Sequence, residues 1–290
     1  MSFEKIAILG GGLLGGSLAL ALSRRFPNQS VALWARREET VAEARSRGVS
    51  GATVDLAAVV GEADLVVLST PVGAMASVLL AAQTAGLSAD ALVTDVGSVK
   101  VAPHRVLSPL LERTGGKFIG SHPMAGSELA GIGAADPDLF DGAACLLTDD
   151  GGVGEPWAGR LAGWWEGLGC RTAWMDASGH DALVARISHF PHLVAAAAAK
   201  VALQSPAEGR FGGGGLRDTT RVAGGDPAMW AEIVTENREA LRPVLSRGIA
   251  EMSEMLALLE SGDQEAVRRW LEAAKDSRAA ALPDLRNDFP

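Results

Sequence analysis

The first 120 residues of the chain alternate short apolar runs with amphipathic stretches. Five of the apolar runs have the length and composition of buried parallel strands. These runs are Lys5–Leu9, Val31–Trp34, Asp64–Ser69, Ala91–Asp95 and Lys117–Gly120. Helical patterns lie between them, for example at Ser17–Arg25 and at Glu38–Arg47, where Gly48 follows as a stop signal. Because strands that alternate with helices form βαβ units, we predict a parallel, doubly wound α/β sheet.

The pattern changes after about residue 176. From Asp181 onward the chain has long helical stretches and no convincing strand, and the alanine run Ala195–Ala199 strongly favours helix. A glycine-rich loop is expected at Gly209–Gly215. Asp226 and Pro227 have the residue types of a helix N-cap and a first helical residue. We therefore predict two domains, an α/β domain over residues 1–176 and an all-helical domain over residues 177–290.

The last part of the predicted helical domain is apolar on more than one face. The helical pattern continues to about Leu259 with a kink at Pro243, and a turn at residues 261–263 begins a last helix that ends near Ala281. The apolar positions include Met252, Met255, Leu256, Leu259 and Trp270. Such a surface is buried either in a homodimer formed through the helical domain, which we favour, or against the first domain of the same chain.

Charge and cysteine content exclude several classes of protein. The chain has 290 residues and a formal net charge of −9, and an acidic surface argues against nucleic acid as a partner. An anionic small-molecule substrate stays open, because a few arginines in a pocket outweigh a diffuse surface charge. Cys145 and Cys170 lie in no CxxC pair and near no histidine at ligand spacing, so we expect neither a disulfide framework nor a metal site.

The same features favour the cytoplasm. Reduced cysteines are typical of that compartment, and the N-terminus lacks the pattern of a secretory leader. No apolar run reaches the roughly 20 residues that span a bilayer, so we expect no membrane association. The chain contains no tyrosine, which excludes any mechanism that needs a phenolic acid or base, including that of the short-chain dehydrogenases.

A glycine cluster directly after the first predicted strand has the spacing of a dinucleotide site. Gly10, Gly12 and Gly15 fit GxGxxG, with Leu13 and Leu14 between the last two glycines. Glycines permit the tight turn and the close approach of a pyrophosphate, and the helix that follows offers free N–H groups to its charge. We expect these five residues to bind the cofactor in a Rossmann-type domain; the alternative is a glycine turn without a ligand.

The end of the second predicted strand bears on which dinucleotide binds. An NAD enzyme usually has Asp or Glu there, bonded to the ribose 2′-hydroxyl. This chain has Ala35, followed by Arg36 and Arg37, whose guanidinium groups suit a 2′-phosphate. We predict NADP as the cofactor, with NAD possible; otherwise the arginines are solvated residues at the start of a helix, beside Glu38 and Glu39.

Ser69, Thr70 and Pro71 follow another predicted strand. They lie at the carboxyl edge of the sheet, where ligands of this fold bind. We expect them to border the nicotinamide ribose of the cofactor, although a simple loop start has the same pattern.

Polar residues gather in four short segments that a cofactor-facing cleft would contain. The segments are Asp95–Lys100 (DVGSVK), Ser121–Glu128 (SHPMAGSE), Ser188–His192 (SHFPH) and Arg217–Arg221 (RDTTR). The first two are expected directly after strands, and the third at the head of the alanine-rich helix. In this order, behind a dinucleotide motif and with DPAMW following, they resemble the prephenate/arogenate dehydrogenase family over nearly the whole chain.

The resemblance implies oxidative decarboxylation of prephenate or arogenate in tyrosine biosynthesis, with a hydride transferred to the dinucleotide. It implies that His122 accepts the proton of the substrate C4 hydroxyl, a role that suits histidine near neutral pH. Ser98 would orient the same hydroxyl, and Arg221 would pair with a substrate carboxylate. His192 would line the substrate pocket from the helical domain, with Trp230 as an apolar wall.

Several of these residues have plainer interpretations. Arg221 could form an ordinary salt bridge to Asp218, Trp230 could be core, and His189 could be structural rather than substrate-binding. Glu128 near the substrate side chain would favour the ammonium group of arogenate, so both substrates stay open, with prephenate favoured.

Two further histidines, His104 and His180, belong to no motif, and we expect them on the surface.

Two other functions are possible for a chain of this pattern. A β-hydroxyacid or 6-phosphogluconate-type dehydrogenase shares the two-domain plan but needs a catalytic lysine, and Lys200 and Lys275 in the helical half have no supporting motif. A dinucleotide sensor without turnover would bind the cofactor and would not need His122.

Overall fold

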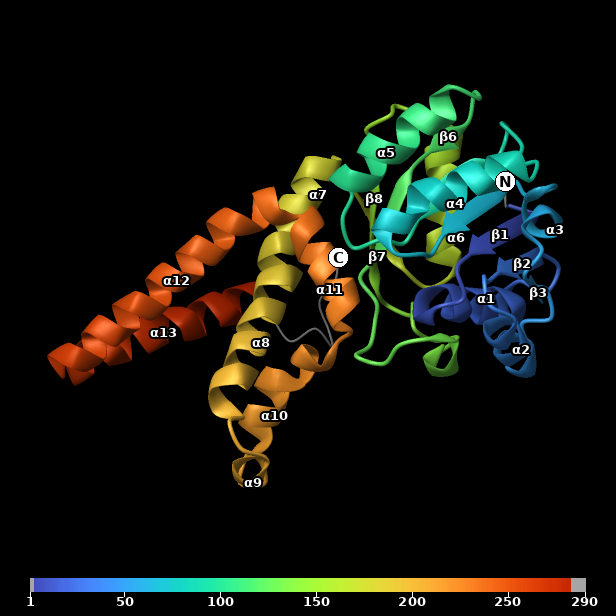
Figure 1. Cartoon of the computed structure of the whole chain (residues 1–290). Coiled ribbons are helices and arrows are strands. Elements are labelled where there is room, and N and C mark those ends of the chain that lie inside the picture. Colours follow the sequence, from blue (N-terminus) through green and yellow to red (C-terminus); the bar gives the residue numbers. More distant parts are fainter. Residues whose placement is uncertain (1–2, 283–290) are drawn as a thin grey trace. The chain divides into compact units, whose positions relative to one another are not determined.

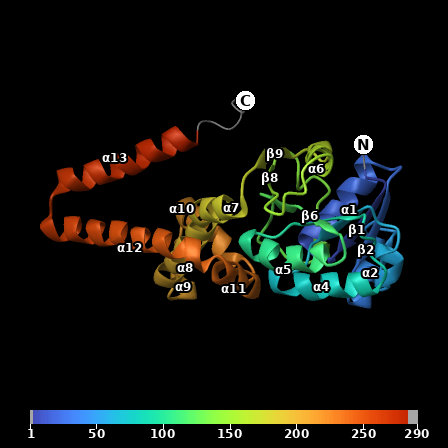
Figure 2. The ribbon, with the colours of Figure 1, turned by 90° about the horizontal axis from the view of Figure 1, so that it is seen from above.

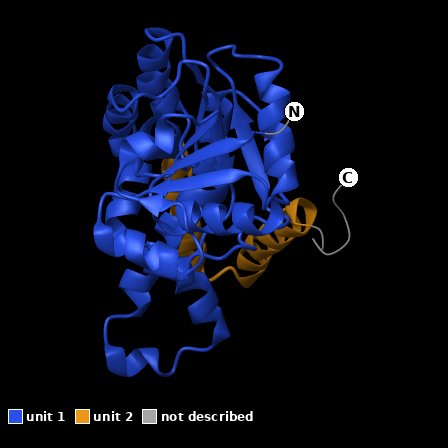
Figure 3. Cartoon of the chain, turned by 90° about the vertical axis from the view of Figure 1, so that its right-hand side faces the viewer, with its two compact units in different colours: residues 1–241 blue, residues 242–290 orange. Residues whose placement is uncertain are grey.

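The computed structural model of the chain describes residues 3–282. The chain forms two compact units, residues 1–241 and residues 242–290 (Figure 3). The last eight residues of the predicted helical domain lie outside the described part.

A six-stranded parallel sheet forms the centre of the first unit (Figure 1). Its strands are β1 (Lys5–Leu9), β2 (Ser30–Trp34), β3 (Ala52–Thr53), β4 (Leu65–Leu68), β5 (Leu92–Asp95) and β6 (Lys117–Phe118). They lie in the order β3-β2-β1-β4-β5-β6, and Ile8 of β1 is in register with Leu33 of β2 and Val67 of β4. The strand order reverses between β1 and β4, which is the topology of a doubly wound dinucleotide fold. The predicted fold class is confirmed.

Helices cover both faces of this sheet. The first set comprises α1 (Leu13–Arg25), α2 (Glu38–Ser46) and α6 (Trp157–Gly167). The second set comprises α3 (Leu56–Val60), α4 (Val72–Thr84) and α5 (Val101–Glu112), and Figure 2 shows α4 and α5 side by side. Side chains alternate along β1, so Ile6 and Ile8 pack in the core under α1, whereas Ala7 and Leu9 pack in the core under α4. Nearly continuous apolar strands are therefore buried on both sides.

The predicted strand Lys117–Gly120 is split between two sheets, which the sequence analysis did not anticipate. β6 ends at Phe118, and the chain continues into β7 (Gly120–Pro123) of a second sheet with the order β7-β8-β9. β8 (Ala144–Thr148) is antiparallel to β7 and parallel to β9 (Arg171–Trp174). Ser121 anchors the change of sheet, since its hydroxyl bonds Thr94 of β5 at 2.7 Å and Trp165 Nε1 of α6 at 3.0 Å. The second polar segment therefore begins within a strand and not after one.

The helical part begins at residue 177 and starts with one continuous helix. This helix comprises α7 (Ala177–Val184), a π-helical turn (Ala185–His189) and α8 (Phe190–Ala202). Segment Ser188–His192 therefore lies in the middle of a helix rather than at its head. The π-turn precedes Pro191, whose missing N–H group interrupts the ordinary helical bonding.

The helix 177–202 is long and apolar enough, by length and composition alone, to cross a membrane. Core helices of other proteins satisfy the same criterion. Here the buried side chains of His180, Asp181 and His189 hydrogen-bond to other side chains or to main-chain groups of other elements. Such contacts are typical of a helix buried in protein.

Shorter helices follow, and two of their starts were predicted. They are α9 (Pro206–Gly209), α10 (Gly214–Thr220), a 3-10 turn (Arg221–Gly224), α11 (Pro227–Glu236), α12 (Arg238–Ser261) and α13 (Gln264–Ala281). Asp226 caps α11 by accepting from the Met229 N–H at 2.9 Å, and Asp263 caps α13. The predicted glycine loop is shorter than expected, because both of its ends belong to α9 and α10.

An apolar stripe lies along α12 in the second unit. Ile249, Met252, Leu256 and Leu259 recur at helical spacing, and each is more than half exposed in the single chain. A contiguous exposed surface of this kind is typical of a contact with another protein chain.

A buried ion pair closes the turn that joins β5 to α5. The Lys100 ammonium pairs with the Asp95 carboxylate and donates to the main-chain oxygen of Gly97 at 3.0 Å. Both charged side chains are fully buried. Each charge therefore depends on the other, because water cannot replace a lost partner.

We expect Lys100→Met to lower the free energy of unfolding by roughly 3–5 kcal/mol, because it leaves the Asp95 charge buried without its partner. Urea denaturation of the variant and the parent protein measures this difference. Lys5→Met is the matched control, since Lys5 pairs with Glu62 on the surface and its loss should change little. Equal unfolding midpoints for the two variants would contradict the expectation.

Candidate active site

The glycine cluster forms a loop so tight that two of its positions have no room for a side chain. Gly10 follows β1 with φ +133°, and a Cβ there would lie 2.5 Å from the main-chain oxygen of Ser69 after β4. A Cβ at Gly15 would overlap the main-chain oxygen of Gly10. Ser69 Oγ donates to that same oxygen at 2.8 Å, so the ends of β1 and β4 are joined at the point where the strand order reverses.

The start of α1 has the features that a dinucleotide pyrophosphate requires. Gly12 is the N-cap, makes no side-chain cap and has open space where a Cβ would stand. Leu13 and Leu14 begin the helix, and its first turn contains no acidic residue. Its first N–H groups are therefore available to an anion. Thr70 Oγ1, beside the Ser69 contact, is buried and has no hydrogen-bond partner among the described residues. Pro71, next along the chain, is the N-cap of α4. The loop and the start of α1 thus fit a bound dinucleotide.

Two arginines follow β2 at the edge of the sheet. Ala35 is buried, and its N–H donates to the Thr53 main chain at 3.2 Å. Arg36 and Arg37 are exposed, and within residues 3–282 neither guanidinium group forms a hydrogen bond or ion pair. Neither of them is paired with Glu38 or Glu39, so both charges are available to a ligand.

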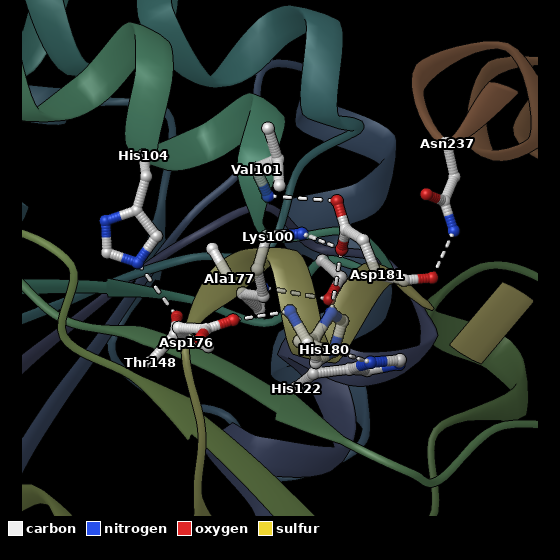
Figure 4. A network of polar contacts seen from close by, with 12 residues as sticks. Lys100, Val101, His104, His122, Thr148, Asp176, Ala177, His180, Asp181 and Asn237 are labelled. Carbon is white, nitrogen blue, oxygen red and sulfur yellow. Dashed lines mark hydrogen bonds and ion pairs between the residues drawn. The ribbon is translucent and has the colours of Figure 1, made fainter. Parts of the chain in front are cut away.

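A second site is a chain of buried polar groups that runs from α5 to β7 (Figure 4). The main-chain N–H groups of Lys100 and Val101 donate to the Asp181 carboxylate at 2.7 and 3.0 Å. Asp181 Oδ1 lies 2.8 Å from His180 Nδ1, and His180 Nε2 lies 2.8 Å from His122 Nδ1. Two segments 58 residues apart in the sequence therefore meet through imidazole rings.

The surface position expected for His180 is wrong, because its side chain is fully buried in this chain of bonds. His104 is also buried rather than exposed. It bonds Thr148 Oγ1 at 2.8 Å, and its ring contacts Phe118 edge-on, apart from His122. The sequence contains one local indication that His180 is buried: it lies beside Asp181 in an apolar helical stretch. The pair His180–Asp181 lies outside the four polar segments, so this indication was missed.

Burial determines the protonation of these rings. It lowers the pKa of His122 well below the usual value, and the neighbouring His180 and Lys100 lower it further. Burial also lowers the pKa of His180, against the opposing effect of its hydrogen bond to Asp181. Both rings are therefore neutral near pH 7. Within the described part of the chain His122 Nε2 forms no hydrogen bond, so this nitrogen is available to a substrate.

The rings of His189, His192 and Trp230 lie together. Asn237 donates to His189 Nδ1 at 2.9 Å, and the His192 ring stacks on Trp230 with centroids 3.5 Å apart. His189 Nε2 and His192 Nδ1 are buried without a partner in residues 3–282. Burial lowers the pKa of His189 to about 4. Buried nitrogens without partners are costly unless a ligand or water meets them.

Ser98, Glu128 and Arg221 complete the predicted set. Ser98 is partly exposed in the turn before α5, and its hydroxyl makes no bond within the described chain. Arg221 pairs with Glu128 at 3.2 Å rather than with Asp218, so that these two predicted substrate residues meet across 93 residues of sequence. No hydrogen bond among the described residues joins this pair to His122.

Comparison with known families accounts for both parts of the chain. Residues 18–174 match the family described as prephenate dehydrogenase, nucleotide-binding domain, and residues 176–273 match prephenate dehydrogenase, dimerization domain. The chain belongs to the prephenate dehydrogenase family. It is thus an NAD(P)-dependent oxidoreductase of tyrosine biosynthesis, and the family predicted from the polar segments is confirmed.

Individual relatives cover almost the entire chain. A prephenate dehydrogenase from Lactococcus lactis is 32% identical over 99% of this chain and 81% of its own length. A crystal structure of prephenate dehydrogenase from Aquifex aeolicus, in complex with hydroxyphenyl propionate and NAD+, has a TM-score of 0.85 at 28% identity and covers 97% of this chain and 99% of its own. Arogenate dehydrogenase from Synechocystis has a TM-score of 0.76 at 29% identity, covering 96% and 99%.

For this member of the prephenate dehydrogenase family, we expect Gly15→Ala to weaken dinucleotide binding by at least about tenfold, because the added Cβ forces the start of α1 away from Gly10. Calorimetric titration with NADP and with NAD measures the dissociation constants. Gly163→Ala in α6 is the control, since open space surrounds that position. Unchanged binding by a folded Gly15→Ala protein would contradict the assigned cofactor loop.

Proposed function

We propose that this prephenate dehydrogenase family member oxidises prephenate with NADP and uses His122 as the base. The observation that carries the assignment is the placement of His122, a buried imidazole whose Nδ1 bonds His180 and whose Nε2 has no hydrogen-bond partner among the described residues. Burial lowers the pKa of His122 well below its usual value, which favours the neutral ring. A neutral ring nitrogen without a protein partner is suited to accept the proton of a substrate hydroxyl. Ser98, with an unengaged hydroxyl in the turn before α5, would orient the same group.

The proposed reaction needs one proton acceptor and one hydride acceptor. The hydroxyl proton at C4 of prephenate moves to His122 Nε2 while hydride leaves C4. A nicotinamide dinucleotide held by the loop Gly10–Gly15 would supply the hydride acceptor. The carbonyl that forms at C4 draws the electron pair of the ring–carboxylate bond into the ring, so carbon dioxide leaves and the ring becomes aromatic.

The remaining predicted residues would hold the substrate. Arg221 presents a planar cation to a carboxylate, and the stacked pair of His192 and Trp230 would form one wall. His189, which is buried against Asn237 and the main chain of Ser98, would support this wall from behind. Glu128 and Arg221 pair with each other at 3.2 Å without a substrate, so either group would bind substrate only after this exposed ion pair opens. Prephenate is the substrate that we propose, and the arogenate dehydrogenase of Synechocystis makes arogenate the alternative to be tested.

We propose that this protein forms a homodimer through its helical part, with the α12 stripe at the interface. The matching family description names this part a dimerization domain, which supports the proposal. We place the domain boundary near residue 176, between the last strand residue, Trp174, and the first residue of α7. Residues 177–241 nevertheless belong to the first compact unit, partly because His180 and Asp181 bond to β7 and α5. Two free, buried cysteines are compatible with the cytoplasm as its proposed location.

Turnover by the purified protein tests the proposal. Prephenate and arogenate are each combined with NADP and NAD, and the reduced cofactor is followed by absorbance. We expect the highest kcat/KM with prephenate and NADP. His122→Asn should lower kcat by about 10²-fold or more, because the proton acceptor is lost.

His104→Asn is the control for that variant, since His104 is buried but bonds only Thr148. It should retain kcat within a few-fold. Absence of turnover in all four mixtures, from folded protein that binds a dinucleotide, would overturn the proposal and favour a dinucleotide sensor.

The choice of NADP depends on Arg36 and Arg37. We expect the double variant Arg36→Ala, Arg37→Ala to lose about 10- to 100-fold in kcat/KM for NADP and little for NAD, because charge-assisted bonds to the 2′-phosphate are removed. Steady-state kinetics with each cofactor measures the ratio. Arg113→Ala, an exposed residue at the C-cap of α5, is the matched control. An unchanged NADP-to-NAD ratio would show that the two arginines do not select the cofactor.

A further inference from the structure

Asp181 and His180 belong to no polar segment that the proposed reaction uses, yet they connect the N-terminus of α5 to His122 (Figure 4). We propose that these two residues are positioning residues that hold His122 in the tautomer with its proton on Nδ1. In this tautomer, Nε2 faces the substrate as an acceptor. The inference rests on the proposed role of His122 as the base.

The direction of each hydrogen bond in the chain follows from the Asp181 carboxylate. Its carboxylate accepts the N–H groups of Lys100 and Val101, the N-cap and first residue of α5. These main-chain donors, at the positive end of a helix, stabilise an ionised carboxylate. An ionised carboxylate only accepts hydrogen bonds. The nitrogen that lies 2.8 Å from Asp181 Oδ1, His180 Nδ1, must therefore carry the proton.

The protonated Nδ1 of His180 then fixes which nitrogen of each ring donates and which accepts. A neutral imidazole carries one N–H group, so His180 Nε2 is an acceptor once Nδ1 has the proton. His122 Nδ1, at 2.8 Å, must then donate to it. The neutral His122 ring consequently has its lone pair on Nε2. Burial, which lowers the pKa of both rings, favours this neutral arrangement at pH 7.

This order has a direct consequence for the reaction. In the opposite tautomer Nε2 would carry a hydrogen and could not accept the proton of the C4 hydroxyl. In the assigned tautomer, that proton moves from the hydroxyl oxygen to Nε2, and the ring becomes a cation. Nδ1 still donates to His180, and the negative Asp181 at the end of the chain stabilises the new charge. No other proton needs to move.

The tautomer can be measured without turnover. The chain has five histidines, so nitrogen-15 NMR of histidine-labelled protein gives few ring signals, and those missing in His122→Asn belong to His122. At pH 7 we expect a neutral His122 with the proton on Nδ1. A proton on Nε2 alone, or a cationic ring, would overturn the inference. Because no substrate is present, this result is independent of whether His122 is the base.

Two substitutions at His180 test the consequence for catalysis. His180→Leu removes the acceptor for His122 Nδ1–H, and we expect kcat to fall by about 10²-fold with KM changed little. His180→Gln supplies an amide oxygen as a substitute acceptor, and its kcat should be about tenfold higher than that of His180→Leu. In the His180→Leu protein, a share of the His122 ring should carry its proton on Nε2.

His104→Leu and His104→Gln are matched controls, since this buried histidine lies outside the chain of bonds. They should retain kcat within a few-fold and should not differ from each other in rate. Equal kcat for His180→Leu and His180→Gln, or full activity of His180→Leu, would overturn the inference. If His180→Leu fails to fold, the His122 tautomer measured by nitrogen-15 NMR in the unsubstituted protein tests the inference by itself. Full activity of His122→Asn would instead refute the proposed function and leave the tautomer measurement valid.

Discussion

The Asp181 carboxylate at the N-terminus of α5 is the contact on which the arrangement of the polar residues depends. It belongs to the helix that begins the helical part, and it accepts two main-chain N–H groups at the end of the β5 turn. That turn is itself closed by the buried pair of Asp95 and Lys100. One carboxylate therefore joins the sheet to the helical part and places His180 against His122 of β7.

The carboxyl edge of the sheet brings the cofactor loop and the polar chain toward a common region. Gly10 follows β1, Ser69 follows β4 and Asp95 ends β5, and these three strands are adjacent. In parallel sheets the ends of neighbouring strands share one edge, and ligands of this fold bind where the strand order reverses. The loop after β1 and the turn after β5 therefore lie at the same edge of the sheet.

Features that depend on neighbouring residues could be predicted from the sequence. The glycine spacing after β1, the apolar runs of β1, β2, β4 and β5, and the caps at Asp226 and Asp263 all express local conformational preferences. Such preferences act over a few residues, and the periodicity of side chains reveals them. The family resemblance then supplied the proposed roles of residues such as His122 and Arg221, which no periodicity indicates.

Contacts between distant segments were decided only by the tertiary structure. The apolar run at residues 117–120 has the composition of one strand, but the bonds of Ser121 to Thr94 and Trp165 divide it between two sheets. His180 lies in an ordinary helical stretch, and only folding brings its ring to His122, 58 residues away. The sequence by itself determined the main strands of the parallel sheet, several helix starts and the chemistry available to them. Only packing decided which polar groups are buried together, because burial and hydrogen bonding depend on partners that no local pattern specifies.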